Sequence, residues 1–139
     1  MAKDVRVLGF NYTQISVERN PDFEGEVKVK SNINISNIEK FKAKIAKQDA
    51  LKVSFESNID YGELGKVVLK GNMIITADSK SLKETLSAWK EKRPNELQIT
   101  IMNIIIQKTS IKSIQLEEEI GLPVHLQNIF PKIKTKQEK

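Results

Sequence analysis

Residues 51–77 read LKVSFESNIDYGELGKVVLKGNMIITA, and this stretch decides the fold. In both of its halves apolar side chains fall on alternate positions, with mostly polar or charged residues between them. Alternation with a period of two is typical of a strand that buries one face. The segment 60–65 between the halves supplies two glycines for a tight turn, so the sequence predicts an antiparallel hairpin. Gly71 lies within the second strand, where it indicates a bend or a close approach of another backbone.

The chain begins with another alternating segment, residues 5–17. Its apolar residues change parity twice, after Val7 and after Tyr12. A slip of one residue inside a strand is what a β-bulge produces, so we expect bulges here. The sequence NPDFEG at 20–25 combines a proline with a glycine and predicts a turn after this strand.

A second strand is predicted from residue 27 to residue 35, where valines and isoleucines share one parity and charged or amide residues face the other way. Residues 37–47 alternate lysines with Phe41, Ala43 and Ile45, so the strand resumes after a break. A short helix is the competing interpretation of this segment. Four strands in sequence, joined by short turns, predict an antiparallel sheet with one covered face.

The last third of the chain changes to a helical period. Ser81 and Glu84 have the spacing of a capping box and predict the start of a short helix that ends near Arg93, before Pro94. Three large apolar residues fall on one face of this helix: Leu82, Leu86 and Trp89.

A second, longer helix is predicted between a cap formed by Asn95 with Gln98 and a stop signal at Gly121. The segment 97–106 is rich in β-branched isoleucine, so a strand is the alternative there. The distance between cap and stop is too long for one strand, which favours the helix. Its expected apolar stripe consists of Leu97, Ile101, Ile104, Ile105 and Ile111. The fold class that follows is α+β, with a four-stranded antiparallel sheet, a crossover with a short helix, a long helix and an apolar C-terminal segment.

The composition excludes several kinds of chemistry. There is no cysteine, which excludes a disulfide, a thiolate nucleophile and any Cys-ligated metal site, and His125 is the single histidine. The segment 62–65 lacks the spacing of a phosphate-binding loop and is interpreted as a hairpin turn. The carboxylates of 117–119 splay around a helix and cannot converge, so we expect a solvated helix end. No catalytic, cofactor-binding or metal-binding residue is predicted, and we expect neither an enzyme nor a cofactor.

The net charge is +5, and part of the excess lies in the tail, residues 131–139. The tail is interpreted as a flexible solubilising terminus, with a patch for nucleic acid or an acidic partner as the alternative. Residues 1–130 are expected to form a single domain. No apolar stretch is long enough to span a membrane, and no apolar signal region follows the N-terminus, so we expect a soluble, cytoplasmic protein without membrane insertion.

After Gly121, residues 122–130 are rich in apolar side chains but have neither strand nor helix period. Together with the face of the short helix, they are more apolar than an irregular surface segment needs to be. They either cover the core or form a subunit interface or a polypeptide-binding groove.

The order of these elements resembles that of the SecB family of protein-export chaperones, over roughly residues 5–130. The Asn-Pro turn after the first strand and the Pro-Asn opening of the long helix are similar to the family's, and so is the Pro-containing segment after that helix. The stretches that carry the resemblance are 12–21, 26–29, 71–75, 94–97 and 121–126.

The resemblance implies an ATP-independent chaperone, a holdase, that binds unfolded polypeptides or preproteins in apolar grooves, as in protein export. It also implies a homo-oligomer, a dimer of dimers with the long helices packed between subunits. SecB proteins are generally acidic and dock the motor SecA, whereas this chain is basic; Glu18 matches one expected acid, but Gln14 replaces another. The SecA partnership is therefore not carried over. The residues expected to contact clients are Leu82, Leu86, Trp89, Leu122, Val124, Leu126, Ile129 and Phe130.

Two other hypotheses remain. The basic charge, with Lys28 and Lys30 on the second predicted strand, suggests an RNA- or ribosome-associated protein, although no aromatic side chains interleave with those lysines for base stacking. A SecB-like adapter for one specific partner, such as a toxin, is the other.

Overall fold

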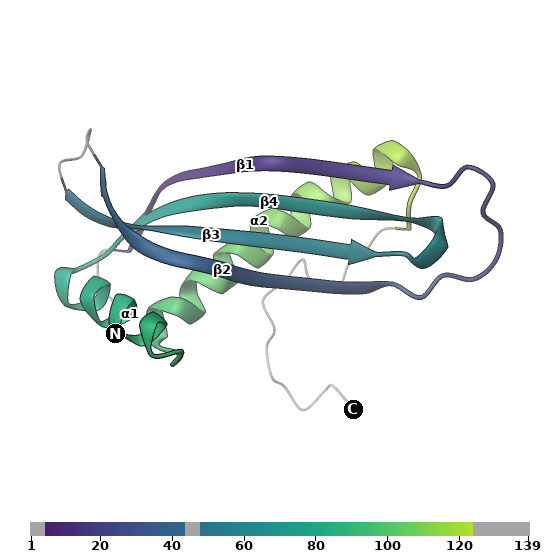
Figure 1. Ribbon diagram of the computed structural model, residues 1–139. Helices are drawn as coiled ribbons and strands as arrows, with labels where there is room; N and C mark the ends of the chain where they lie inside the picture. The colour runs from purple at the N-terminus through teal and green to yellow at the C-terminus, as the bar shows by residue number, and fades with distance from the viewer. Residues whose placement is uncertain (1–4, 44–47, 124–139) are drawn as a thin grey trace, which may run out of the picture.

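The computed structural model describes residues 5–43 and 48–123. It confirms the α+β fold, with a four-stranded antiparallel sheet followed by a short and a long helix (Figure 1). In chain order the elements are β1 (Arg6–Arg19), β2 (Lys30–Ala43), β3 (Gln48–Asp60), the 3₁₀ helix η1 (Gly62–Leu64), β4 (Gly65–Thr76), α1 (Ser79–Lys90) and α2 (Glu96–Ile120).

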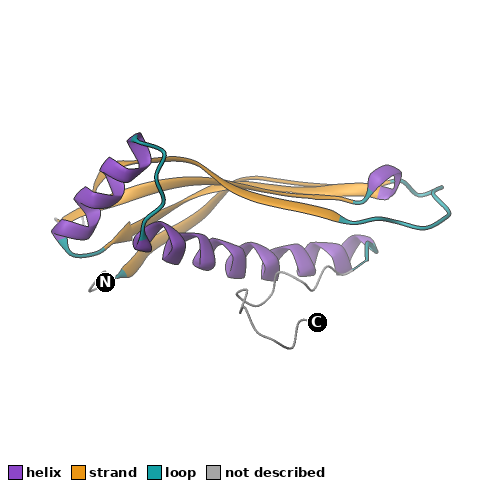
Figure 2. Ribbon diagram, turned by 90° about the horizontal axis from the view of Figure 1, so that it is seen from below, coloured by secondary structure: helices purple, strands orange, loops and turns teal. Residues whose placement is uncertain are grey.

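The spatial order of the strands is β1-β4-β3-β2, and every neighbouring pair is antiparallel. The central hairpin of β3 and β4 is the one predicted from its alternation. β1 lies beside β4 although it is the first strand in sequence, so β1 and β2 form the two edges of the sheet. α2 runs along one face of the sheet, and α1 lies at the end where α2 begins (Figure 2).

Both predicted bulges in β1 are present, as register shifts between Val7 and Gly9 and between Tyr12 and Gln14. Each shift keeps the apolar residues of this strand on the covered face. Phe10 pairs with Met73, and Ile15 pairs with Leu69. The two partners on β4, Met73 and Leu69, are fully buried. Because directly opposed residues in a ladder point to the same face, Phe10 and Ile15 lie on the side of α2.

β2 continues through Ala43 with one register shift between Ile35 and Asn37, so the break expected after residue 35 is a bulge and the competing helix is wrong for 37–43. The strand begins at Lys30 and not at residue 27 as expected. Residues 44–47 lie outside the described residues.

The hairpin between β3 and β4 is closed by η1, which begins at Gly62 with a left-handed φ of 66°. Gly71 is required by close packing, because a Cβ added there would overlap the carbonyl oxygen of Asn11 and crowd the ring of Phe55. The expected close backbone approach at this glycine is therefore confirmed.

The short helix begins earlier than predicted. Asp78 is the N-cap of α1, and its carboxylate accepts hydrogen bonds from the backbone N–H of Ser81 at 3.1 Å and from its hydroxyl at 2.8 Å. The expected box of Ser81 with Glu84 is wrong, because an aspartate three residues ahead of Ser81 takes the capping role.

The long helix is confirmed, and the strand alternative for 97–106 is wrong. The Asn95 side chain accepts from the backbone N–H of Gln98, and Gly121 ends the helix with φ 81°. Its buried row follows every fourth residue, and four residues turn a helix by about 400°, so the row winds slowly around it. Ile111, expected in the stripe, is 55% exposed because the winding turns it away from the sheet. The fully or nearly fully buried row is Leu97, Ile101, Ile105, Thr109, Ser113 and Glu117.

The core has two parts. The α1-end core lies where α1 and the first half of α2 meet the sheet, and the turn-end core lies beneath η1. The buried members of the α1-end core are Ile38, Leu51, Val53, Phe55, Met73, Ile75, Leu82, Leu97, Ile101 and Ile105. Those of the turn-end core are Ile59, Tyr61, Leu64, Val67, Leu69 and Leu122.

Glu117 corrects the expectation of a solvated helix end. Its side chain is 0% exposed and accepts a hydrogen bond from the hydroxyl of the buried Tyr61. Glu118 and Glu119 are exposed, as expected. The three consecutive carboxylates differ because only Glu117 falls on the buried row of every fourth residue. Burial, together with the bond to Glu117 and its negative charge, raises the pKa of Tyr61 well above its usual value.

Candidate functional site

A pocket of about 490 Å³ lies at the corner between α1 and α2. Its wall is the half-buried indole of Trp89, which packs against the α1-end core. The other lining residues come from the connection between the helices and the first turn of α2: Lys92, Arg93, Pro94 and Gln98.

Local backbone geometry forms this corner. Lys92 has a φ of 59°, and the next backbone N–H, that of Arg93, donates to the carbonyl of Ala88 at 2.8 Å, which closes the end of α1. The Gln98 side chain donates to the carbonyl of Arg93 at 2.9 Å, and Asn95 donates to the Thr85 hydroxyl at 2.9 Å. The pocket thus joins an aromatic wall to two cationic side chains on a connection that is hydrogen-bonded at both ends.

The residues expected to contact clients occupy different places. Trp89 lines the corner pocket, and Leu86 is half-buried against the α1-end core. Leu82 is only 5% exposed and Leu122 only 4%, so both are core residues that support the surface from beneath. The others lie outside the described residues, together with His125 and the basic tail: Val124, Leu126, Ile129 and Phe130.

A second groove, of about 270 Å³, lies between β1 and α2 and was not expected from the sequence. Tyr12 donates from its hydroxyl to the carbonyl of Lys108 at 3.3 Å, which ties the edge strand to the helix. Burial raises the pKa of Tyr12 to about 12. The lining residues are Phe10, Tyr12, Lys108, Ile111, Lys112 and Gln115.

The aromatic rings of this groove form a packed floor. Phe10 stacks on the buried Phe55 with ring centres 5.0 Å apart and meets Tyr12 edge-on at 5.4 Å. The ammonium of Lys108 lies 5.4 Å from the centre of the Phe10 ring, within the range of a cation–π contact. The parity shifts in residues 5–17 indicated only the share that β1 contributes to this groove, because the bulges keep Phe10, Tyr12 and Ile15 on one face.

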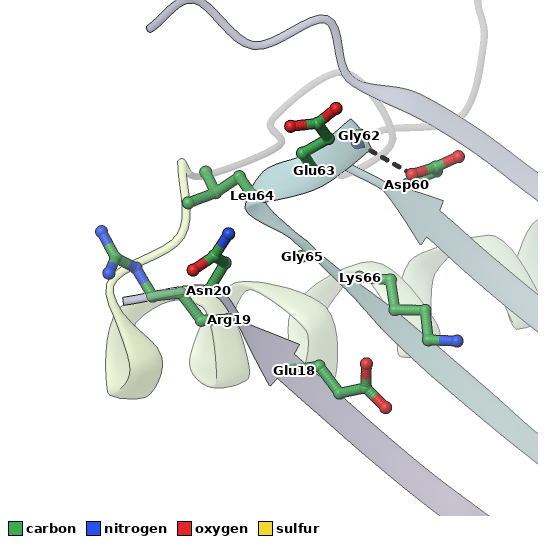
Figure 3. A pocket seen from close by; sticks show the side chains of 9 residues that line it. All are labelled: Glu18, Arg19, Asn20, Asp60, Gly62, Glu63, Leu64, Gly65 and Lys66. Atoms are coloured by element: carbon green, nitrogen blue, oxygen red, sulfur yellow. Dashed lines mark hydrogen bonds between the residues drawn. The ribbon is translucent and has the colours of Figure 1, made fainter. Parts of the chain in front are cut away.

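The third pocket, of about 360 Å³, surrounds the η1 turn (Figure 3). Its charges are mixed, with Lys66 paired in register with Glu18 on one side and Asp60 on the other. Asp60 accepts from the backbone N–H of Gly62 at 2.8 Å, and Arg19 donates to the carbonyl of Gly121 at 3.2 Å. The Asp60 bond closes the turn itself, which supports the interpretation of 62–65 as a hairpin turn, whereas the Arg19 bond ties the end of β1 to the end of α2.

Several large apolar side chains are strongly exposed, and one of them, Ile111, also lines the groove between β1 and α2. On α2, Ile99 is 58% and Ile111 is 55% exposed, and on the edge strand β1, Ile15 is 46% exposed. Contiguous exposed apolar patches are typical of surfaces that contact another polypeptide.

The open face of the sheet is polar and carries charges of both signs. Lys70 pairs in register with Glu56 and Gln14, and Lys52 pairs with Glu39. Phe10, Tyr12 and Phe55 belong to the opposite, covered face, as their contacts with the α1-end core show.

Comparison with models of known families, with curated proteins and with solved structures found no match. Within residues 5–43 and 48–123, no cluster of three or more His, Cys, Asp or Glu side chains could hold a metal ion. Neither of the described helices has the combination of length and hydropathy that a membrane crossing requires.

Proposed function

We propose that this protein is an ATP-independent holdase that binds unfolded polypeptides through apolar grooves. The observation that carries the proposal is the pair of aromatic-lined pockets, at the α1–α2 corner and between β1 and α2, with strongly exposed isoleucines on the same elements. Such a surface suits extended chains that present apolar side chains in no fixed order.

The free energy of apolar burial is suited to holding unfolded polypeptides. Apolar surface removed from water contributes about 25 cal/mol per Å², whichever side chains supply it. Two shallow grooves on one subunit each hold a short segment, and a chain that occupies both binds more tightly by multivalency. Release needs no nucleotide, because each contact by itself is weak.

The resemblance of the element order to SecB chaperones supports the same proposal. It also supports a homo-oligomer, a dimer of dimers in which exposed residues of α2 such as Ile99 pack between subunits. The grooves and the exposed isoleucines then divide the surface between clients and self-association. Cytoplasmic location and a role in protein export belong to this proposal.

The RNA-binding alternative has less support among the described residues. The lysines of the open sheet face have acidic neighbours in register, as Lys66 and Lys70 show, so no strong positive field arises there. The aromatic rings that could stack on bases lie on the covered face. An adapter for one partner is tested by the same experiment, because it would hold that partner alone.

The test is light scattering while a chemically unfolded client is diluted with and without this protein, at low and moderate salt. We expect suppression of aggregation near stoichiometric amounts, without ATP and nearly independent of salt. No suppression with several unrelated clients would contradict the proposal. Suppression lost as salt rises would favour charge-driven binding. Light scattering of the protein alone measures the oligomer.

Trp89→Ala tests the corner pocket. We expect at least a severalfold weaker hold on clients, because the indole supplies the wall of the pocket. The matched control is a variant that lowers stability without touching the pocket, such as Leu69→Ala in the turn-end core, assayed at a temperature where both variants are folded. Equal losses in the two variants would assign the effect to stability and not to the pocket.

A further inference from the structure

The groove between β1 and α2 has a charge pattern that apolar holding alone does not require. Its lining combines Phe10, Tyr12 and Ile111 with two cationic side chains, Lys108 and Lys112. None of the described residues that line it is acidic. An apolar segment without charges would leave both ammonium groups without an acidic partner, whereas a segment with carboxylates would pair them.

The position of Lys108 is set by the groove itself. Its backbone carbonyl accepts from Tyr12, and its ammonium lies over the ring of Phe10. Lys112 follows one helical turn later, about 6 Å further along the axis of α2. The cations therefore lie beside the aromatic floor, where they can meet carboxylates at successive groove-facing positions next to an apolar side chain.

The edge strand offers the backbone contacts that an extended segment needs. Among the described strands β1 pairs only with β4, so its outer edge is open to a further strand. Alternate side chains of an added strand face the groove, and they advance about 6.6 Å from one to the next. This step is close to the spacing of the two lysines along the helix.

We propose that this groove selects extended segments in which an apolar side chain sits on the aromatic floor and carboxylates occupy the next two groove-facing positions in succession, at Lys108 and Lys112. The inference rests on the proposed holding function and names the class of client segment that this groove prefers, an apolar residue with acidic residues two and four positions away on the same side.

The test is fluorescence anisotropy with three labelled peptides of equal length. The first has glutamates at the second and fourth positions on one side of a phenylalanine. The second has lysines in their place, and the third has the same composition as the first with the glutamates moved by one position. We expect the first to bind about tenfold more tightly than the second, since each exposed ion pair changes affinity by up to about fivefold. The third should lose most of that gain, and the preference should shrink as salt rises.

The variant Lys108→Gln with Lys112→Gln should bind the first two peptides equally. The matched control, Lys66→Gln with Lys70→Gln, removes the same charge from the open face of β4 and should keep the preference. Equal binding of all three peptides to the natural protein, or a preference kept by the groove variant, would overturn this inference and leave the holding function intact. Charge-selective peptide binding without suppression of client aggregation would instead overturn the holding function.

Discussion

The two halves of α2 cover the sheet in different ways. The first half buries Leu97, Ile101 and Ile105 in the α1-end core. The second half continues the same row of every fourth residue, but with Thr109, Ser113 and Glu117. The first half is held by apolar packing. In the second half the buried row is polar: the Thr109 hydroxyl donates to the carbonyl of Ile105 within the helix at 2.7 Å, and Glu117 accepts from Tyr61, while Leu116 and Ile120 pack against the turn-end core.

This difference in buried side chains implies that the two halves of α2 contribute to stability in different ways. Apolar burial is non-directional and tolerates the loss of a few atoms at a graded cost. A buried carboxylate is tolerated only in one geometry, because it must keep its donors. We therefore expect the first half to supply stability and the second half to set how the helix is seated under η1.

Ile101→Ala should have the largest effect. The side chain is fully buried, and truncation leaves a cavity, so we expect a loss of about 2–5 kcal/mol in the free energy of unfolding. Urea unfolding followed by circular dichroism measures it. Ile99→Ala on the exposed side of the same helix is the control and should change stability by less than about 0.5 kcal/mol. Similar losses in the two variants would contradict the assignment of the buried row.

Tyr61→Phe should cost less, about 1–3 kcal/mol, because it removes one donor from a fully buried carboxylate while keeping the ring. Tyr12→Phe is the matched control. Its hydroxyl makes a longer bond, 3.3 Å, to a backbone carbonyl, and its loss should cost about 0.5 kcal/mol. If Tyr61→Phe is no more costly than Tyr12→Phe, the second half of α2 is not held by this pair.

Alkaline pH should lower the free energy of unfolding, because Tyr12 and Tyr61 ionise less readily in the folded state than in the unfolded state. The folded-state pKa of Tyr12 is raised to about 12 and that of Tyr61 is raised further, whereas an unfolded tyrosine ionises near 10. The unfolded state loses its protons first, so the stability that these groups contribute is present below pH 10 and is lost as the pH rises toward 12 and beyond.

Unfolding curves between pH 8 and pH 12, about the range set by these pKa values, measure the slope of stability with pH. The double variant Tyr12→Phe with Tyr61→Phe should show a shallower decline than the natural protein. An unchanged slope would show that the two hydroxyls ionise equally well in the folded and unfolded states.

Ser113→Ala should have the smallest effect. Among the described residues, the Ser113 hydroxyl is the buried side-chain group without a hydrogen-bond partner. Its removal should leave stability unchanged or raise it by up to about 1 kcal/mol. Thr109→Val, which removes a hydroxyl that is bonded, is the comparison and should be destabilising. A clear loss in Ser113→Ala would indicate a partner for this hydroxyl in the assembled protein.

Only some residues of the candidate sites could be predicted from the sequence. Trp89 was expected at the surface of the short helix, and it lines the corner pocket. The groove between β1 and α2 was missed, because it joins Phe10 and Tyr12 to Lys108 and Ile111, about a hundred residues later in the chain. No periodicity within one segment can indicate such a meeting.

The sequence by itself determined the local features: the alternation of the strands, the two bulges of β1, the caps of α2 at Asn95 and Gly121, and the close approach at Gly71. Each depends on residues within a few positions, or on a glycine that only close packing requires.

Only the tertiary structure decided that β1 lies beside β4, that Ile111 faces outward and that Glu117 is buried against Tyr61. These depend on how α2 is seated on the sheet. The buried row of every fourth residue winds around the helix, so which side chains are covered changes along its length. That seating is set by contacts between residues far apart in the chain, which the pattern of one helix does not contain.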